Sequence, residues 1–318
     1  MSLETKIPKI TLLETVLKEV LACPQCRGTL TRDLHREALR CAACAAEFPL
    51  VEGIPVFTRG SLGLQEDERR FRDKAAQEQL SQKGQNLRAV AGRHHCIPVM
   101  EKHARSFLNR FSKQDWILDI GTGYAWPWAE TAGGPLILGI DLSLGNLLLA
   151  KQLLEESAPV LLLCADASRL PLRDGVISGV WSAQAFQHFP EPVFRNMQGE
   201  LDRVLKPQFL LESHHLHPAL LYRLLCKLRG RPLHLRGRCG PFETNRLSLS
   251  EWQARWAGFR EGRSEISCGY SELFFHPEMG LRPRPYPVEL ERWLASHAPA
   301  LAGVIARQGI LHVETAFS

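Results

Sequence analysis

Two pairs of cysteines near the start of the chain constrain its folding most. Each pair has the spacing C-x2-C, and fourteen residues separate the pairs: Cys23 and Cys26, then Cys41 and Cys44. Each tight turn presents two sulfurs, and a hairpin of about a dozen residues brings two such turns together as a tetrahedral zinc site. A disulfide pair or four unrelated core thiols would not explain the matched spacings. Because four protein sulfurs leave no open coordination position, we expect a structural zinc ion, not a catalytic one.

The residues that flank the cysteines carry a family resemblance. Val20-Leu21-Ala22-Cys23-Pro24 opens the unit, and the apolar run from Phe48 to Phe57 closes it. Residues 13–58 resemble the Trm112-type zinc ribbon, and we expect this domain to occupy residues 1–58. Members of that family often accompany methyltransferases, as a separate subunit or fused to the catalytic chain, so the resemblance implies a methyltransferase further along.

Length and composition predict a two-part soluble protein. The 318 residues exceed one ordinary domain, and a hydrophobic content of 45% can bury a sizeable core. We expect no membrane span and no signal peptide, since the longest apolar stretches have the length of strands. Nine cysteines, four of them assigned to zinc, suit a reducing compartment, so the expected location is the cytoplasm.

Residues 59–97 differ in character from what precedes them. Charged and amide side chains dominate from Gln65 to Gln85, with few apolar anchors. We interpret residues 59–97 as a charged helical linker or lid, and its charges as a solvated face. A helix over about 98–111 leads into the next domain.

Strands and helices alternate from Asp115 onward. Apolar runs predict strands at 116–120, 136–141, 160–164, 179–182 and 209–212, and helices are expected at about 143–156 and 191–205. Such alternation predicts an α/β fold with a doubly wound parallel sheet that binds its ligand at the carboxyl ends of the strands. Glycines directly after the first strand let a ligand approach the backbone and the next helix N-terminus.

The glycine turn distinguishes two classes of cofactor. A dinucleotide fingerprint, G-x-G-x-x-G, requires a third glycine where this chain has Trp126. The order Asp119-x-Gly121-x-Gly123 instead resembles motif I of class I S-adenosylmethionine-dependent methyltransferases of type 11. Later segments match that family in order: Asp141, Asp166-Ala167, Leu170 to Gly175, Gln187-His188 and Arg203 to Pro207.

This second resemblance covers residues 98–212 and implies a Rossmann-like, seven-stranded methyltransferase domain over 98–318. It also implies a set of S-adenosylmethionine-binding residues, with Asp141 on both ribose hydroxyls and Asp166-Ala167 beside the adenine. The full set is Asp119, Gly121, Thr122, Gly123, Asp141, Leu142, Asp166, Ala167 and Ser182.

Three departures from the family pattern leave an alternative open. Ala125 replaces a glycine, Ser178 replaces an acid, and Gln208-Phe209 replaces a glycine pair. The first two motivate the alternative that the chain is a non-catalytic zinc and cofactor-binding scaffold or partner-binding module.

Methyl transfer from a sulfonium requires no obligatory catalytic residue, because the leaving group is already activated. If the acceptor must lose a proton, His188 after the fourth strand is the candidate base, and the alternative is a histidine that packs the site wall. Gln184 in the same segment could contact either ligand.

The acceptor has two candidate classes. Six basic residues and no acidic one lie within residues 213–242, so this part of a basic insertion at about 213–257 accounts for the whole net charge of +5. Near an active-site rim it could attract RNA phosphates, as a ribosomal-RNA or transfer-RNA base methyltransferase would need. A small metabolite would instead suit the aromatic residues Trp126, Trp128, Phe186 and Phe189. His214, His215 and His217 could bind a metal ion, but no fixed helical or strand spacing supports that, so we expect them to be loop histidines near the mouth.

Overall fold

The computed structural model describes residues 9–58, 63–82, 86–124, 126–128, 134–155, 158–233, 235–239 and 242–315. Its centre is a seven-stranded sheet in the order β12-β13-β9-β8-β5-β6-β7. The parallel strands are β5 (Trp116–Ile120), β6 (Leu136–Asp141), β7 (Val160–Cys164), β8 (Ile177–Ala183) and β9 (Leu205–Leu216). At one edge β12 (Ser264–Ser271) and β13 (Gln308–Thr315) run antiparallel.

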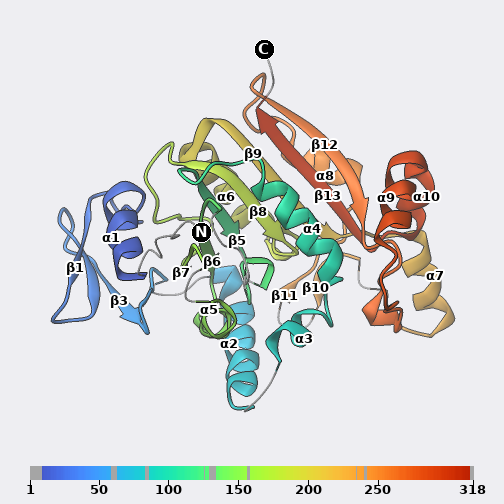
Figure 1. The fold of residues 1–318 in the computed structure, drawn as a ribbon, viewed down its shortest axis with the longest axis horizontal. Helices are drawn as coiled ribbons and strands as arrows, with labels where there is room; N and C mark the ends of the chain where they lie inside the picture. Colours follow the sequence, from blue (N-terminus) through green and yellow to red (C-terminus); the bar gives the residue numbers. More distant parts are fainter. Residues whose placement is uncertain are drawn as a thin grey trace, which may run out of the picture.

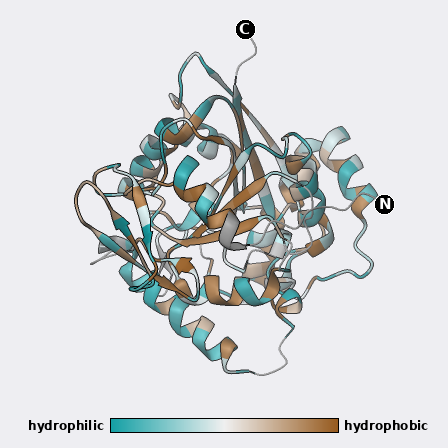
Figure 2. Cartoon of the chain, turned by 60° about the vertical axis from the view of Figure 1, so that its left-hand side comes forward, coloured by the Kyte–Doolittle hydropathy of each residue, from teal (hydrophilic) through white to brown (hydrophobic). Residues whose placement is uncertain are grey.

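Helices cover both faces of this sheet, which explains why its central strands are apolar throughout: every residue of β5 and β7 is buried. One face, with Ile117 and Trp181, packs against α4 (Ile97–Leu108) and α5 (Leu144–Leu153). The other face, with Leu118 and Val180, packs against α6 (Glu191–Val204) and α8 (Leu249–Trp256). Figure 2 shows the central strands mainly in the hydrophobic colour, while the surrounding helices present mixed faces. The expected doubly wound α/β fold is confirmed.

The N-terminal unit lies at the free β7 edge of the sheet (Figure 1). It consists of α1 (Lys9–Glu19) and a four-stranded antiparallel sheet, β1 (Leu30–Asp33), β2 (Ala38–Cys41), β3 (Glu47–Val51) and β4 (Ile54–Pro55). Along the chain, α2 (Glu66–Leu80) and α3 (Leu87–Ala91) follow this unit and occupy the segment expected to be a helical linker.

The segment after β9 contains α7 (Leu220–Leu228), the short pair β10 (Arg238–Cys239) and β11 (Phe242–Glu243), and α8. Two further helices, α9 (Val288–His297) and α10 (Pro299–Ile305), follow β12 and lie beside α7 on the side of the molecule away from the N-terminal unit (Figure 1). Among the described helices, none combines the length and apolar character needed to cross a membrane.

β9 differs from the sequence prediction in length. It extends from Leu205 to Leu216, so Gln208 and Phe209 lie inside a strand and not in a turn. The expectation that His214 and His215 are loop histidines is wrong: both are buried in β9, because that strand pairs with β8 on one side and β13 on the other up to its end. His217 follows the strand and is also buried.

Candidate cofactor cleft and zinc site

The two cysteine turns adopt the same backbone structure. In the first, Arg27 N donates to Cys23 O and Cys23 N to Gly28 O, at 2.8 and 2.9 Å. In the second, Ala45 N donates to Cys41 O and Cys41 N to Ala46 O, at 3.1 and 2.9 Å. Arg27 and Ala45, which directly follow the second cysteine of each turn, both have positive φ, 63° and 57°. Two equivalent turns therefore face one another.

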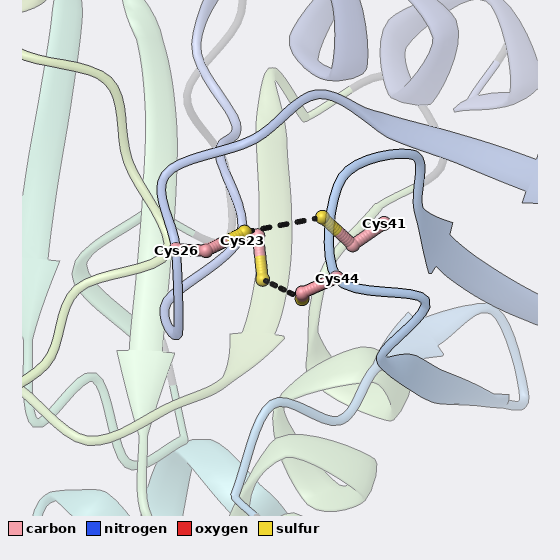
Figure 3. Close-up of side chains that lie close together, drawn as sticks. All are labelled: Cys23, Cys26, Cys41 and Cys44. Carbon is pink, nitrogen blue, oxygen red and sulfur yellow. Dashed lines mark hydrogen bonds between the residues drawn. The ribbon is translucent and has the colours of Figure 1, made fainter.

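The four sulfurs of these turns converge (Figure 3). Cys23 Sγ lies 3.7 Å from Cys44 Sγ, and Cys26 Sγ lies 3.4 Å from Cys41 Sγ. All four lie within 4.8 Å of one another. A tetrahedron with zinc–sulfur bonds of about 2.3 Å has sulfurs about 3.8 Å apart, so the donor set and spacing fit zinc. Cys41 and Cys23 are buried, whereas Cys26 and Cys44 reach the surface.

The zinc-ribbon unit is bound to the main domain through backbone and side chains. Phe57 N donates a hydrogen bond to Cys164 O at 2.7 Å, so the last residues of the ribbon pair with the edge strand β7. Leu21 pairs antiparallel with Leu172. Arg27 donates to Leu170 O and forms an ion pair with Glu200, both at 2.7 Å. The ribbon therefore closes an edge that would otherwise be open, and its apolar residues share one core with the main sheet.

A cavity of about 520 Å³ opens at the carboxyl ends of β5, β6 and β8. The glycine turn after β5 forms its floor. Gly121 has φ +71°, and a Cβ there would lie 2.3 Å from Ala185 Cβ, so the position requires glycine. A cavity of this size falls in the range of small-molecule sites, which is about 300–1,000 Å³.

Asp141 lies at the end of β6 and holds the turn from the side of the cavity. Its Oδ2 accepts a hydrogen bond from Gly123 N at 3.0 Å, and its Oδ1 accepts one from Ser143 N at 2.8 Å. Burial raises the pKa of this carboxyl, and the donated backbone hydrogen bonds oppose the rise. Each carboxylate oxygen retains a lone pair with which to accept from a ligand hydroxyl.

Asp119 has a different role, although it also lines the cavity. Its Oδ2 accepts from Trp128 Nε1 at 2.7 Å and from the hydroxyl of Thr122. Asp119 thus ties the turn to the buried Trp128, which packs edge-on against Trp181.

Helix α2, in the segment interpreted as a charged linker or lid, forms a wall of the cavity. Glu68, Arg69, Arg72 and Gln79 line the cavity from α2. Asp73 Oδ1 accepts from Ser143 Oγ at 2.7 Å and from Gly145 N at 3.1 Å, which fixes α2 to the start of α5. The charged run is therefore solvated only in part. Asp67, Arg70 and Lys74 are exposed, whereas the paired charges of Glu68, Arg69 and Arg72 face the cavity.

The part of the cavity beyond the glycine turn is lined by polar and aromatic side chains. His188, on the short η3 (Phe186–His188), lines the cavity, as do His94, His95 and Phe189. Gln184 also lines it, with a φ of +60°, an uncommon value for a residue other than glycine. Its side-chain nitrogen is buried with no hydrogen-bond partner, which leaves a donor available to a ligand.

The predicted site residues fall into two groups. Those that line the cavity are Asp119, Gly121, Thr122, Gly123, Asp141, Leu142, Ala167 and His188. The cavity lining does not include Asp166 or Ser182; Asp166 Oδ1 accepts from Ser168 N at 2.7 Å, and Ser182 Oγ donates to Ile120 O at 3.0 Å. Trp128 and Phe186 belong to the core, so neither is available to an acceptor. Ala125 and the Trp126 side chain lie outside the described part of the structure.

Comparisons with known proteins agree with this geometry. Residues 118–211 match the family described as methyltransferase domain, and residues 17–53 match the Trm112p-like protein family. The chain joins a Trm112p-like ribbon to a methyltransferase domain.

The similar sequences cover only the Trm112p-like ribbon, whereas a similar solved structure covers most of the chain. For the Trm112p-like ribbon, a UPF0434 protein of Methylibium petroleiphilum is 46% identical over 44 residues, which are 14% of this chain and 68% of that protein. A UPF0434 protein of Mannheimia succiniciproducens is 39% identical over 56 residues, 17% of this chain and 92% of that protein. A solved complex that contains the Haloferax volcanii Trm112 methyltransferase activator includes a chain with TM-score 0.50 and 17% identity. That match covers 79% of this chain and 97% of the other, and it supports the fold.

Proposed function

We propose that this protein is an S-adenosylmethionine-dependent methyltransferase whose cofactor lies in the cavity at the carboxyl ends of β5 and β6. The position of Asp141 carries the proposal. Its carboxylate faces the glycine turn inside a cavity of about 520 Å³, where it can accept hydrogen bonds from both ribose hydroxyls.

The residues around Asp141 fit the rest of such a cofactor. The turn at Gly121 and Gly123 allows the methionine part close to the backbone, and Leu142 and Ala167 offer apolar walls to an adenine. In this proposal Asp166 and Ser182 act from outside the cavity, by holding the ends of their strands. Asp119 keeps the turn in place through Thr122 and Trp128.

The bound cofactor supplies an activated methyl group, so the protein must position the acceptor and exclude water. Gln184 offers an unpartnered amide donor, and His188 lies on the same wall as the candidate base for an acceptor that loses a proton. Helix α2 covers the cofactor side and limits access of water.

We favour a small-molecule acceptor over RNA. None of the described basic side chains of the segment after β9 lines the cavity; the lining contains Arg69 and Arg72, whose charges are paired with acids of α2. RNA stays the second candidate because Arg223, Lys227 and Arg231 are exposed on or next to α7.

The non-catalytic alternative loses part of its motivation. Ser178, which replaces an acid of the family pattern, donates a hydrogen bond to Asp115 at the amino end of the sheet, away from the carboxyl-end cavity. The substitution therefore has a structural explanation that does not affect the cofactor cleft.

For the four thiolates we propose a structural zinc ion that stabilises the ribbon against the methyltransferase domain within one chain. The equivalent turns and the sulfur spacing support it. Thiolates must stay reduced to bind metal, which favours the cytoplasm as the place of action.

A methyl-transfer screen tests the function. Zinc-loaded protein is incubated with methyl-labelled S-adenosylmethionine and separate RNA, protein and small-metabolite fractions of a cell extract, with Asp141→Ala as the inactive control. We expect label in the small-metabolite fraction, and Gln184→Ala should reduce transfer while retaining cofactor affinity. Cofactor binding without label in any fraction would favour the scaffold alternative.

Label in the RNA fraction would instead assign the acceptor to RNA. In that case the Arg223→Ala, Lys227→Ala, Arg231→Ala triple variant should flatten the dependence of log affinity on log salt by at most about 2, since each lost phosphate contact on a single strand contributes about 0.7. An unchanged slope would show that this basic surface does not contact RNA.

A further inference from the structure

A second cluster of metal-ligating side chains lies on the sheet under α4. Glu212 lies on β9, opposite Trp181 of β8 on one side and His312 of β13 on the other. His214, two residues along the strand, projects to the same face as Glu212. His103 reaches the same place from α4. Three elements therefore bring three imidazoles to one carboxylate.

The four side chains converge on the Glu212 carboxylate, which is hydrogen-bonded to His214 in the metal-free structure. Glu212 Oε1 lies 2.7 Å from His214 Nε2 and 4.0 Å from His103 Nδ1, while Glu212 Oε2 lies 3.5 Å from His312 Nδ1. One ligand atom from each of His103, Glu212 and His214 lies within 4.8 Å of the others.

The buried carboxylate also lacks a permanent cation. Glu212 is 5% exposed and His214 is 1% exposed. Within the described residues, no lysine or arginine forms an ion pair with Glu212, and the nearby Arg110 is paired with Glu314. His214 Nδ1 is buried with no hydrogen-bond partner. Burying a charge without a compensating cation is costly, and a bound divalent ion would supply that compensation.

We propose that His103, Glu212 and His214 bind a divalent transition-metal ion, with His312 beside the free carboxylate oxygen. Two imidazoles and one carboxylate suit zinc, cobalt or nickel better than magnesium or calcium, which prefer all-oxygen sites. In a tetrahedral site with metal–ligand bonds of about 2.0–2.2 Å the ligand atoms lie about 3.3–3.6 Å apart. His103 must therefore move about half an ångström closer to Glu212, and the hydrogen bond between Glu212 and His214 must open when the ion binds.

The site would have a structural role next to the cofactor cleft. It joins α4 to β9, and the His214 ring lies 4.8 Å from the ring of Trp181, which lines the cleft. His214 O also accepts a hydrogen bond from Gln184 N at 2.7 Å. A metal ion here would fix the strand that supports both cleft residues. The proposal stands on this geometry alone and does not depend on the proposed methyl transfer.

Cobalt titration separates this site from the thiolate site. Metal-free protein receives one equivalent of zinc, which the four thiolates bind first, and is then titrated with Co²⁺ alone. We expect one further equivalent to bind, with weak visible d–d absorption and without the intense thiolate charge-transfer band. Elemental analysis after gel filtration should give one zinc and one cobalt per chain.

Two variants and one control decide the assignment. Glu212→Gln and His103→Ala should each weaken cobalt binding at least tenfold and leave the first equivalent of zinc in place. His297→Ala, which removes an exposed histidine on α9, should change nothing. His103 is partly exposed, so its variant keeps the test valid if Glu212→Gln fails to fold. Binding of only one metal ion by the wild type, or unchanged cobalt affinity in His103→Ala, would overturn the proposal.

Discussion

At the scale of single residues, the buried carboxylate of Asp119 beside the glycine turn destabilises the folded protein when it is ionised. Burial raises its pKa to about 6, although Thr122 and Trp128 donate to it. The unfolded chain has a carboxyl pKa of about 4 here, so between pH 4 and 6 the folded protein binds more protons than the unfolded one. The contribution of Asp119 to stability is therefore most favourable below about pH 4 and falls as pH rises to about 6.

Asp119→Asn should remove this pH dependence while retaining an oxygen that accepts from Thr122 and Trp128. A pKa difference of about two units corresponds to about 3 kcal/mol. Relative to the wild type, the variant should therefore gain about 2 kcal/mol in free energy of unfolding between pH 4.5 and pH 7.5, measured by urea denaturation. A difference between the two proteins that is independent of pH would contradict this assignment.

Gly28 in the first cysteine turn allows the sulfurs to approach. A Cβ at this position would lie 2.8 Å from Ala43 Cβ and 3.0 Å from Cys41 Sγ. Gly28→Ala should therefore weaken zinc binding, measured by competition with a chromophoric chelator. Adding Ala43→Gly should restore part of the affinity by removing one of the two close contacts. Equal zinc affinity in all three proteins would show that the turns have more room than the structure gives them.

At the scale of secondary-structure elements, α2 is held over the cleft by Asp73. This carboxylate accepts from Ser143 Oγ and from Gly145 N, and a Cβ at Gly145 would lie 2.8 Å from Ala76 Cβ. Asp73→Ala should loosen the helix: amide hydrogen exchange across residues 66–80 should accelerate at least tenfold, and S-adenosylmethionine affinity should fall several-fold. Glu78→Ala, an exposed acid on the same helix, is the matched control. Identical exchange in the two variants would mean that Asp73 does not fasten α2.

The elements that could be predicted from the sequence are those marked by a motif or an apolar run within a short stretch of chain. The matched C-x2-C spacings located the ribbon, and the apolar runs at 116–120, 136–141 and 160–164 coincide with β5, β6 and β7. The glycine turn and Asp141 could be placed at the cavity from the sequence, because each lies in a recognisable motif directly at the carboxyl end of a predicted strand.

The remaining features depend on tertiary contacts that local patterns do not contain. The charges of α2 are typical of a solvated helix, and only the packing on α5 shows that they line a cavity. β9 was predicted too short because a strand with Glu212, His214 and His215 is polar, yet two neighbouring strands bury it. The convergence of His103 with Glu212 has no sequence signature, since more than a hundred residues separate them.

At the scale of the whole molecule, the ribbon and the methyltransferase domain share one core. Leu21, Phe48 and Phe57 of the ribbon belong to the same buried cluster as Leu170 and Leu172. Ribbon backbone also pairs with Cys164 and Leu172 of the main domain. If the four cysteines bind zinc, a ribbon joined in this way should not lose the ion without affecting the sheet.

Removal of zinc should consequently destabilise the entire chain in one transition. With an unfolding entropy of about 2.1 cal/mol/K per residue, a loss of about 3 kcal/mol would lower the melting temperature of a 318-residue protein by roughly 4–5 °C. Calorimetry of the chelator-treated protein should show a single transition at the lower temperature, and Cys23→Ser should reproduce it while Cys226→Ser should not. A separate low-temperature transition with the main one unmoved would show that the ribbon unfolds independently.

Isothermal titration calorimetry measures whether the cavity binds S-adenosylmethionine through Asp141. The wild type should bind one equivalent of cofactor. Asp141→Ala loses charge-assisted hydrogen bonds of about 1.5–3 kcal/mol, so its affinity should fall tenfold to a hundredfold with the fold intact. The control Asp174→Ala, which removes an exposed acid outside the cavity, should bind like the wild type. Absence of binding to the wild type at millimolar cofactor would show that the cavity is not a site for S-adenosylmethionine, and equal affinity in wild type and Asp141→Ala would show that Asp141 does not hold it.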